Sequence, residues 1–137
     1  MPNKNYTCFP AEWAPQSFIQ LTWPHEHTDW APILDEAECC FAEIAKAIAK
    51  REKLVIVTPE PDSVRLKLSG IEGFDRIVFV EAPTNDTWAR DHGGITVVRD
   101  GKPVVYDFMF NGWGLKFAAN FDNLITRRCF DAGVFAN

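Results

Sequence analysis

In the first half of the chain, short apolar runs alternate with one long amphipathic segment. The run 18–23 predicts a strand that ends at Pro24, because proline cannot donate to a sheet ladder. Thr28 or Asp29 is expected to cap the helix that follows. Apolar residues in that helix recur at steps of three and four and predict one buried stripe, consisting of Leu34, Ala37, Phe41, Ile44 and Ile48.

Two further strands are predicted at 54–57 and 76–80. The first is continuously apolar, which is typical of a strand buried on both faces of a sheet. Between them, Asp62 or Ser63 is expected to cap a short helix that runs through Leu68.

The second half of the chain begins with a loop rich in polar and charged residues. The elements predicted there are the loop 83–94, strands at 95–98 and 104–110 joined by an Asp100-Gly101 hairpin turn, and a helix at 122–130. The segment 133–135 resembles the start of another strand, so we expect more protein to follow. Together these elements predict a mixed α/β fold.

Composition narrows the class of protein. A chain of 137 residues with 47% hydrophobic and 24% charged residues is expected to fold as one globular domain. No apolar run is long enough for a membrane span, and no signal sequence is visible. The net charge of −5 and the absence of a basic stripe argue against nucleic acid as a partner. We therefore expect a cytoplasmic protein.

The cysteines and histidines carry only weak signals. The four cysteines lack CxxC spacing and are read as reduced thiols, with Cys39 and Cys40 in core or boundary positions and Cys129 as a small buried thiol. His25, His27 and His92 with Glu26 could hold a metal, but their spacing matches no established zinc pattern. No phosphate-binding glycine loop is present. We expect neither metal nor cofactor.

The loop 84–94 concentrates the candidate chemistry, since it contains two carboxylates, an indole, a guanidinium and an imidazole. On a single helical turn, Trp88 and Asp91 would point to one side. A carboxylate beside an aromatic ring suits a planar cation, which can accept stacking and donate paired hydrogen bonds. The alternative is purely structural, with an internal Asp–Arg pair and Trp88 filling a gap; the residues alone leave both open.

Four stretches resemble one family in the same order. The run 83–93, which contains NDTWARDHG, resembles the signature loop of agmatine deiminases and Porphyromonas-type peptidylarginine deiminases. The other stretches are TWPH at 22–25 with Asp29-Trp30, FNGWGLKF at 110–117, and Asp122-Asn123. The resemblance covers nearly the whole chain from Phe18 onward.

This resemblance implies a fold and an activity. The family fold is a pseudo-fivefold α/β propeller of ββαβ units around a substrate tunnel, of which 1–137 would form about two units at the N-terminal end. The activity is hydrolysis of agmatine to N-carbamoylputrescine and ammonia, a step of putrescine biosynthesis, through a cysteine thiouronium intermediate. The expected partner is a small cationic guanidine, and homo-oligomers are conceivable. Segments like those that carry the family's nucleophilic cysteine and catalytic histidine are missing from this sequence.

By the same resemblance, Asp91 would grip the guanidinium as a catalytic residue. Trp88, Asp86, Asn111 and Trp113 would bind the substrate or brace the tunnel, Arg90 would hold the loop through a carboxylate such as Asp86, and His92 receives no role. The sequence favours agmatine over peptidyl-arginine without excluding the latter. The alternative hypothesis is a stand-alone, non-catalytic module that binds a cationic ligand or a protein.

Overall fold

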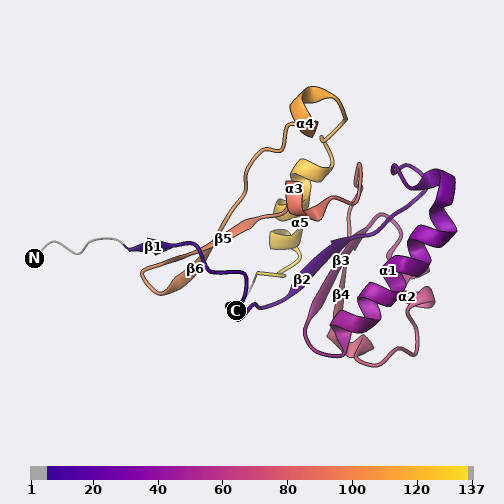
Figure 1. Cartoon of the computed structure of the whole chain (residues 1–137), viewed down its shortest axis with the longest axis horizontal. Coiled ribbons are helices and arrows are strands. Elements are labelled where there is room, and N and C mark those ends of the chain that lie inside the picture. Colours follow the sequence, from indigo (N-terminus) through magenta and orange to yellow (C-terminus); the bar gives the residue numbers. More distant parts are fainter. Residues whose placement is uncertain (1–5, 136–137) are drawn as a thin grey trace, which may run out of the picture.

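A three-stranded parallel sheet forms the centre of the computed structural model, which describes residues 6–135 (Figure 1). Its strands are β2 (Ile19–Thr22), β3 (Leu54–Thr58) and β4 (Ile77–Glu81), in the order β2-β3-β4. The two connections contain the helices α1 (Leu34–Ala49) and α2 (Pro61–Lys67). All three strands predicted in the first half of the chain are confirmed, with bounds shifted by no more than one residue.

The sheet has two apolar faces. Leu54 and Ile56 point to the side covered by α1 and α2, which Figure 1 shows beyond one face of the sheet. Val55 and Val57 point to the other side and pack against α5 (Ile125–Asp131). Every residue of β3 is buried, as the continuous apolar run predicts.

Helix α1 contains all five residues of the predicted stripe, but its buried face is rotated slightly from that stripe. Ala37, Ala45 and Ala49 are buried, whereas Ile44 is 40% exposed. The small alanines allow the helix to approach the sheet closely, so they replace the larger residue as the contact. Cys39 and Cys40 are exposed, and their prediction as core or boundary residues is therefore wrong.

Both predicted helix caps are wrong. The 3₁₀ turn Ala31–Ile33 precedes α1, and the Thr28 hydroxyl instead donates to the carbonyl of His25 at 2.7 Å. Helix α2 begins at Pro61, and neither Asp62 nor Ser63 caps it. Proline at the first helical position has no N–H, so one fewer backbone donor is left without a partner at this helix start.

A separate antiparallel sheet lies beside the parallel one (Figure 1). Strands β5 (Ile95–Arg99) and β6 (Lys102–Tyr106) form the predicted hairpin, with positive φ at both turn residues, Asp100 and Gly101. Strand β1 (Thr7–Cys8), which the sequence pattern did not reveal, pairs with β5.

The last helix ends in a turn, and the strand predicted at 133–135 does not form. Gly133 N–H donates to the carbonyl of Phe130, and Val134 N–H donates to that of Cys129, both at 2.9 Å. These bonds close the end of α5, and Val134 is buried against the sheet. The apolar character of 133–135 therefore reflects packing between α5 and the parallel sheet.

The described residues form a mixed α/β structure, as predicted. None of their helices combines the length and the apolar character that a membrane crossing requires.

Candidate functional site

The loop between β4 and β5 contains the short helix α3 (Ala89–His92), as the sequence suggested. Trp88 is its N-cap residue, and its carbonyl accepts the N–H of Asp91 at 2.9 Å. Trp88 itself has non-helical backbone angles (φ −78°, ψ 66°), so this bond joins the two residues within one turn without setting the relative direction of their side chains.

Asp86 organises the start of this loop. It is buried, and its carboxylate accepts the N–H of Thr87 at 2.8 Å and the indole Nε1–H of Trp88 at 3.1 Å. Burial raises the pKa of Asp86 above its ordinary value, and the nearby charge of Asp29 raises it further, although the hydrogen bond from Thr87 acts in the opposite direction. Asp86 thus fixes the orientation of the Trp88 ring.

Trp88 lies between two tryptophans from distant segments, Trp30 and Trp113. Its ring centroid lies 6.3 Å from that of Trp30 and 6.4 Å from that of Trp113, and the latter pair is edge-to-face at 87°. The Trp30 indole donates to the Thr87 hydroxyl at 2.9 Å. Trp88 and Trp113 both remain partly exposed, so their rings form an accessible aromatic wall.

Trp113 lies on α4 (Gly112–Leu115), a turn whose residues all have positive φ. The Asn111 side chain accepts the N–H of Gly114 at 3.0 Å and braces this turn. The structure therefore brings Asp86, Trp88 and Trp113 together, with Asn111 at the base of the turn that carries Trp113.

Asp91 is exposed on α3. Its carboxylate makes no ion pair or side-chain hydrogen bond with any residue in the range 6–135, so it is free to accept a ligand. We expected Arg90 to pair with a carboxylate such as Asp86. It pairs instead with Glu12, at 3.2 Å between exposed groups. Asp86 is buried and its oxygens already have donors, which explains the difference.

A cavity of about 380 Å³ lies beside the aromatic wall, within the size range of small-molecule sites. Its lining residues follow the carboxyl ends of β2, β3 and β4 and continue into the segment after α4. They are His25, His27, Asp29, Pro59, Pro83, Thr84, Asn85, Asp86, Trp113, Phe117, Ala118 and Phe121. Trp113 belongs both to this lining and to the contact with Trp88, so the cavity adjoins the Trp88–Asp91 turn.

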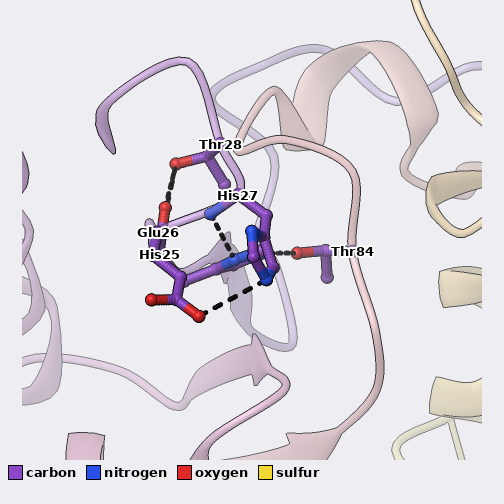
Figure 2. Close-up of polar contacts among 5 residues, drawn as sticks. All are labelled: His25, Glu26, His27, Thr28 and Thr84. Carbon is purple, nitrogen blue, oxygen red and sulfur yellow. Dashed lines mark hydrogen bonds and ion pairs between the residues drawn. The ribbon is translucent and has the colours of Figure 1, made fainter. Parts of the chain in front are cut away.

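His25 lines the cavity, and Figure 2 shows its polar contacts with His27 and Thr84. The backbone N–H of His27 donates to His25 Nδ1 at 3.3 Å, so the proton of a neutral ring lies on Nε2, which donates to the Thr84 hydroxyl at 2.8 Å. Burial, reinforced by nearby His27, lowers the pKa of His25. Sequence reasoning assigned His25 and Asp29 no place in the site, although their position just after a strand was a usable signal.

The metal alternative does not form in the described part of the chain. No group of three or more His, Cys, Asp or Glu side chains there lies close enough to hold an ion. His92 is buried on α3, while His27 is exposed. Cys129 is buried, as predicted, and burial raises its pKa to about 11.

The fold defines an α/β protein with a ligand-sized cavity at the carboxyl edge of its parallel sheet. Comparison with known proteins identifies the family. The chain belongs to the Porphyromonas-type peptidyl-arginine deiminases, whose family model matches residues 8–136.

Individual relatives agree with this assignment. The agmatine deiminase of Stutzerimonas stutzeri is 35% identical over 84% of this chain and 31% of its own length. The structure of a C. jejuni agmatine deiminase C315S variant with substrate bound superposes with a TM-score of 0.86 at 31% identity, covering 96% of this chain and 38% of that one. A Porphyromonas gingivalis protein named as a candidate arginine deiminase is 54% identical, with a TM-score of 0.82, over 93% of this chain and 38% of that one. The chain thus spans between 31% and 38% of the length of these relatives.

Proposed function

We propose that this chain provides the substrate-binding part of a guanidine deiminase that hydrolyses agmatine to N-carbamoylputrescine and ammonia. One observation carries the proposal: Asp86 fixes Trp88 against Trp113, on the turn that presents an unpaired Asp91. A guanidinium remains protonated at neutral pH. Asp91 would accept its paired N–H groups, and Trp88 would pack beside its flat face.

The chemistry requires a thiolate and a proton carrier. The thiolate adds to the guanidinium carbon, ammonia leaves with a proton, and water then hydrolyses the thiouronium to the ureido product and regenerates the thiol. No described cysteine lines the cavity. Cys129 is buried with a pKa of about 11, Cys39 and Cys40 lie on α1, and Cys8 lies in β1. We therefore assign both groups to residues outside this sequence.

We also propose that 1–137 forms about two units of a five-unit α/β propeller. The length of the relatives supports this proposal, since the chain covers 38% of the C. jejuni structure. The cavity would then be one part of a tunnel that further units complete.

Agmatine fits the cavity better than peptidyl-arginine does. The lining contains the carboxylates Asp29 and Asp86 and, among the described residues, neither Lys nor Arg. An ammonium at the far end of agmatine would be attracted by these charges, whereas an arginine within a peptide has no such ammonium. Two relatives that are 35% and 34% identical to this chain are named agmatine deiminases, which also supports agmatine as the substrate.

Replacement of two adjacent residues in the intact polypeptide tests the proposal. Asp91→Ala should lower kcat/KM for agmatine about a hundredfold or more, because each hydrogen bond to a charged group contributes about 1.5–3 kcal/mol. Arg90→Lys is the matched control and should change the rate little, since Arg90 and Glu12 form only an exposed pair. Release of ammonia is the measurement. A near-wild-type rate for Asp91→Ala would remove Asp91 from the site.

A further inference from the structure

Asp122, in the 3₁₀ turn that precedes α5, is bonded to the loop that carries Trp88 and Asp91. It is buried, and its Oδ1 accepts the backbone N–H of Asn85 at 2.6 Å and that of Asp86 at 3.4 Å. The Asn85 side chain returns the contact, because its Oδ1 accepts the N–H groups of Phe121 at 2.7 Å and of Asp122 at 3.1 Å. With a further bond from Asn85 Nδ2 to Asn120 Oδ1 at 3.3 Å, the two segments are joined by five hydrogen bonds.

Asn123, the next residue, is bonded to the segment that leads into α4. Its Oδ1 accepts the N–H of Phe110 at 2.7 Å, and its Nδ2 donates to the carbonyl of the same residue at 2.8 Å. The side chain thus satisfies both backbone groups of Phe110. Phe110 directly precedes Asn111 and Trp113 and packs edge-to-face on the Trp113 ring at 4.8 Å.

These contacts differ from ordinary helix capping. Polar residues at a helix start usually accept N–H groups of their own helix. Asp122 and Asn123 instead bind backbone groups 37, 36 and 13 residues away in sequence. Two adjacent side chains therefore tie two separate loops to the start of one helix.

From this geometry we infer that Asp122 and Asn123 are positioning residues that set the relative placement of Trp88 and Trp113. Asp122 acts through Asp86, whose carboxylate holds the Trp88 indole. Asn123 acts through Phe110 and the turn after it. As a consequence, which rests on the proposed function, these two residues control the affinity for a cationic guanidine without touching it.

The test combines kinetics with fluorine NMR of the intact polypeptide labelled with 5-fluorotryptophan. The variants are Asp122→Ala, Asn123→Ala and, as a matched control from α5, Asp131→Ala, which loses only an exposed pair with Arg127. Trp88→Phe and Trp113→Phe assign the two signals. We expect Asp122→Ala to shift the Trp88 signal and Asn123→Ala to shift the Trp113 signal, while Asp131→Ala shifts neither.

In kinetics, each alanine variant should raise KM for agmatine about tenfold, equivalent to about 1.4 kcal/mol, and change kcat less. Asp122→Asn retains an oxygen acceptor and should restore KM most of the way. Asn123→Asp retains the acceptor for Phe110 N–H but loses the donor to its carbonyl, so it should give an intermediate shift of the Trp113 signal.

Unchanged signals and KM in folded alanine variants would overturn the inference, even if the variants were less stable. If they do not fold, the Trp113 signal of Asn123→Asp decides. If the wild-type protein shows no turnover of agmatine, the proposed function fails, while the fluorine signals still decide whether Asp122 and Asn123 position the two rings.

Discussion

Burial divides the ionisable side chains of the site loop into two groups with different tasks. Asp86 and His92 are buried, and Asp91 is exposed. The oxygens of Asp86 already accept bonds from Thr87 and Trp88, so in the proposed function this residue would act chiefly through the ring it orients. Asp91 has no ion pair or side-chain hydrogen bond with the residues 6–135, so in the proposed function its oxygens would accept the guanidinium.

His92 should make the stability of the protein dependent on pH. It is buried without a hydrogen-bond partner for either ring nitrogen among the described residues, and burial lowers its pKa although Asp122, Asp91 and Asp86 act to raise it. The neutral ring is therefore favoured in the folded state. The contribution of neutral His92 to stability is fully present above pH 6.5, the ordinary pKa of the unfolded state. It is lost as pH falls below 6.5 toward the lower pKa of the folded state.

We accordingly expect the free energy of unfolding to decrease between about pH 7.5 and about pH 5.5 in urea titrations, and His92→Gln to reduce this decrease. The pKa of His25 is lowered as well, so part of the dependence should remain until both rings are replaced. Identical pH dependence in wild type and His92→Gln would contradict the prediction. The raised pKa of Asp86 has the opposite effect on stability, because the folded state binds this proton more readily than the unfolded state. Its contribution starts from the ordinary value of 3.8, which lies below the pH window named above.

At the scale of elements, α4 is the least expected structure, because it is a turn with φ of +61, +53, +80 and +66 from Gly112 to Leu115. Positive φ is costly for residues with a Cβ, and successive ones are rare. The turn is stabilised by the Asn111 side chain and by i→i+4 bonds to the carbonyls of Asn111 and Gly112. The strained turn carries Trp113, whose side chain is exposed.

The two glycines of this turn allow a matched comparison. A Cβ at Gly112 would lie 2.2 Å from the Phe117 carbonyl oxygen, whereas one at Gly114 would meet nothing within 4 Å. Both replacements incur the cost of positive φ, about 1–2 kcal/mol. Gly112→Ala should therefore destabilise more than Gly114→Ala in urea unfolding and should also weaken agmatine binding. Equal effects of the two would show that the close approach is unimportant.

Predictability from sequence followed the range of the interactions. The apolar run of β3 and the Asp100-Gly101 turn were predictable, since local residue types determine them. Thr28 was read as a helix cap, yet its hydroxyl binds the nearer carbonyl of His25, and a short-range pattern does not distinguish the two. The bonds from Asp122 and Asn123 to distant loops could not be read from spacing at all, because they depend on the packed arrangement of α5.

For the molecule as a whole, the cavity is assembled at one edge of the parallel sheet from segments that follow three strands and α4. No single segment contains it, which explains why the sequence revealed Asp86 and Trp113 but not His25, Asp29 or Thr84 as neighbours. Large apolar side chains stay exposed nearby, including Phe108, Met109, Leu115 and Phe117. Such a surface is typical of one that other protein segments cover.

The whole-molecule prediction concerns catalysis by the 137 residues alone. The proposed reaction needs a thiolate at the guanidinium carbon. Among the cysteines, Cys129 is buried with a pKa of about 11, Cys39 and Cys40 lie on α1, and Cys8 lies in β1. We therefore expect no release of ammonia from agmatine in a coupled assay in which the intact polypeptide is active. Turnover by the 137 residues that a single Cys→Ser replacement abolished would place the nucleophile in this chain and contradict the assignment.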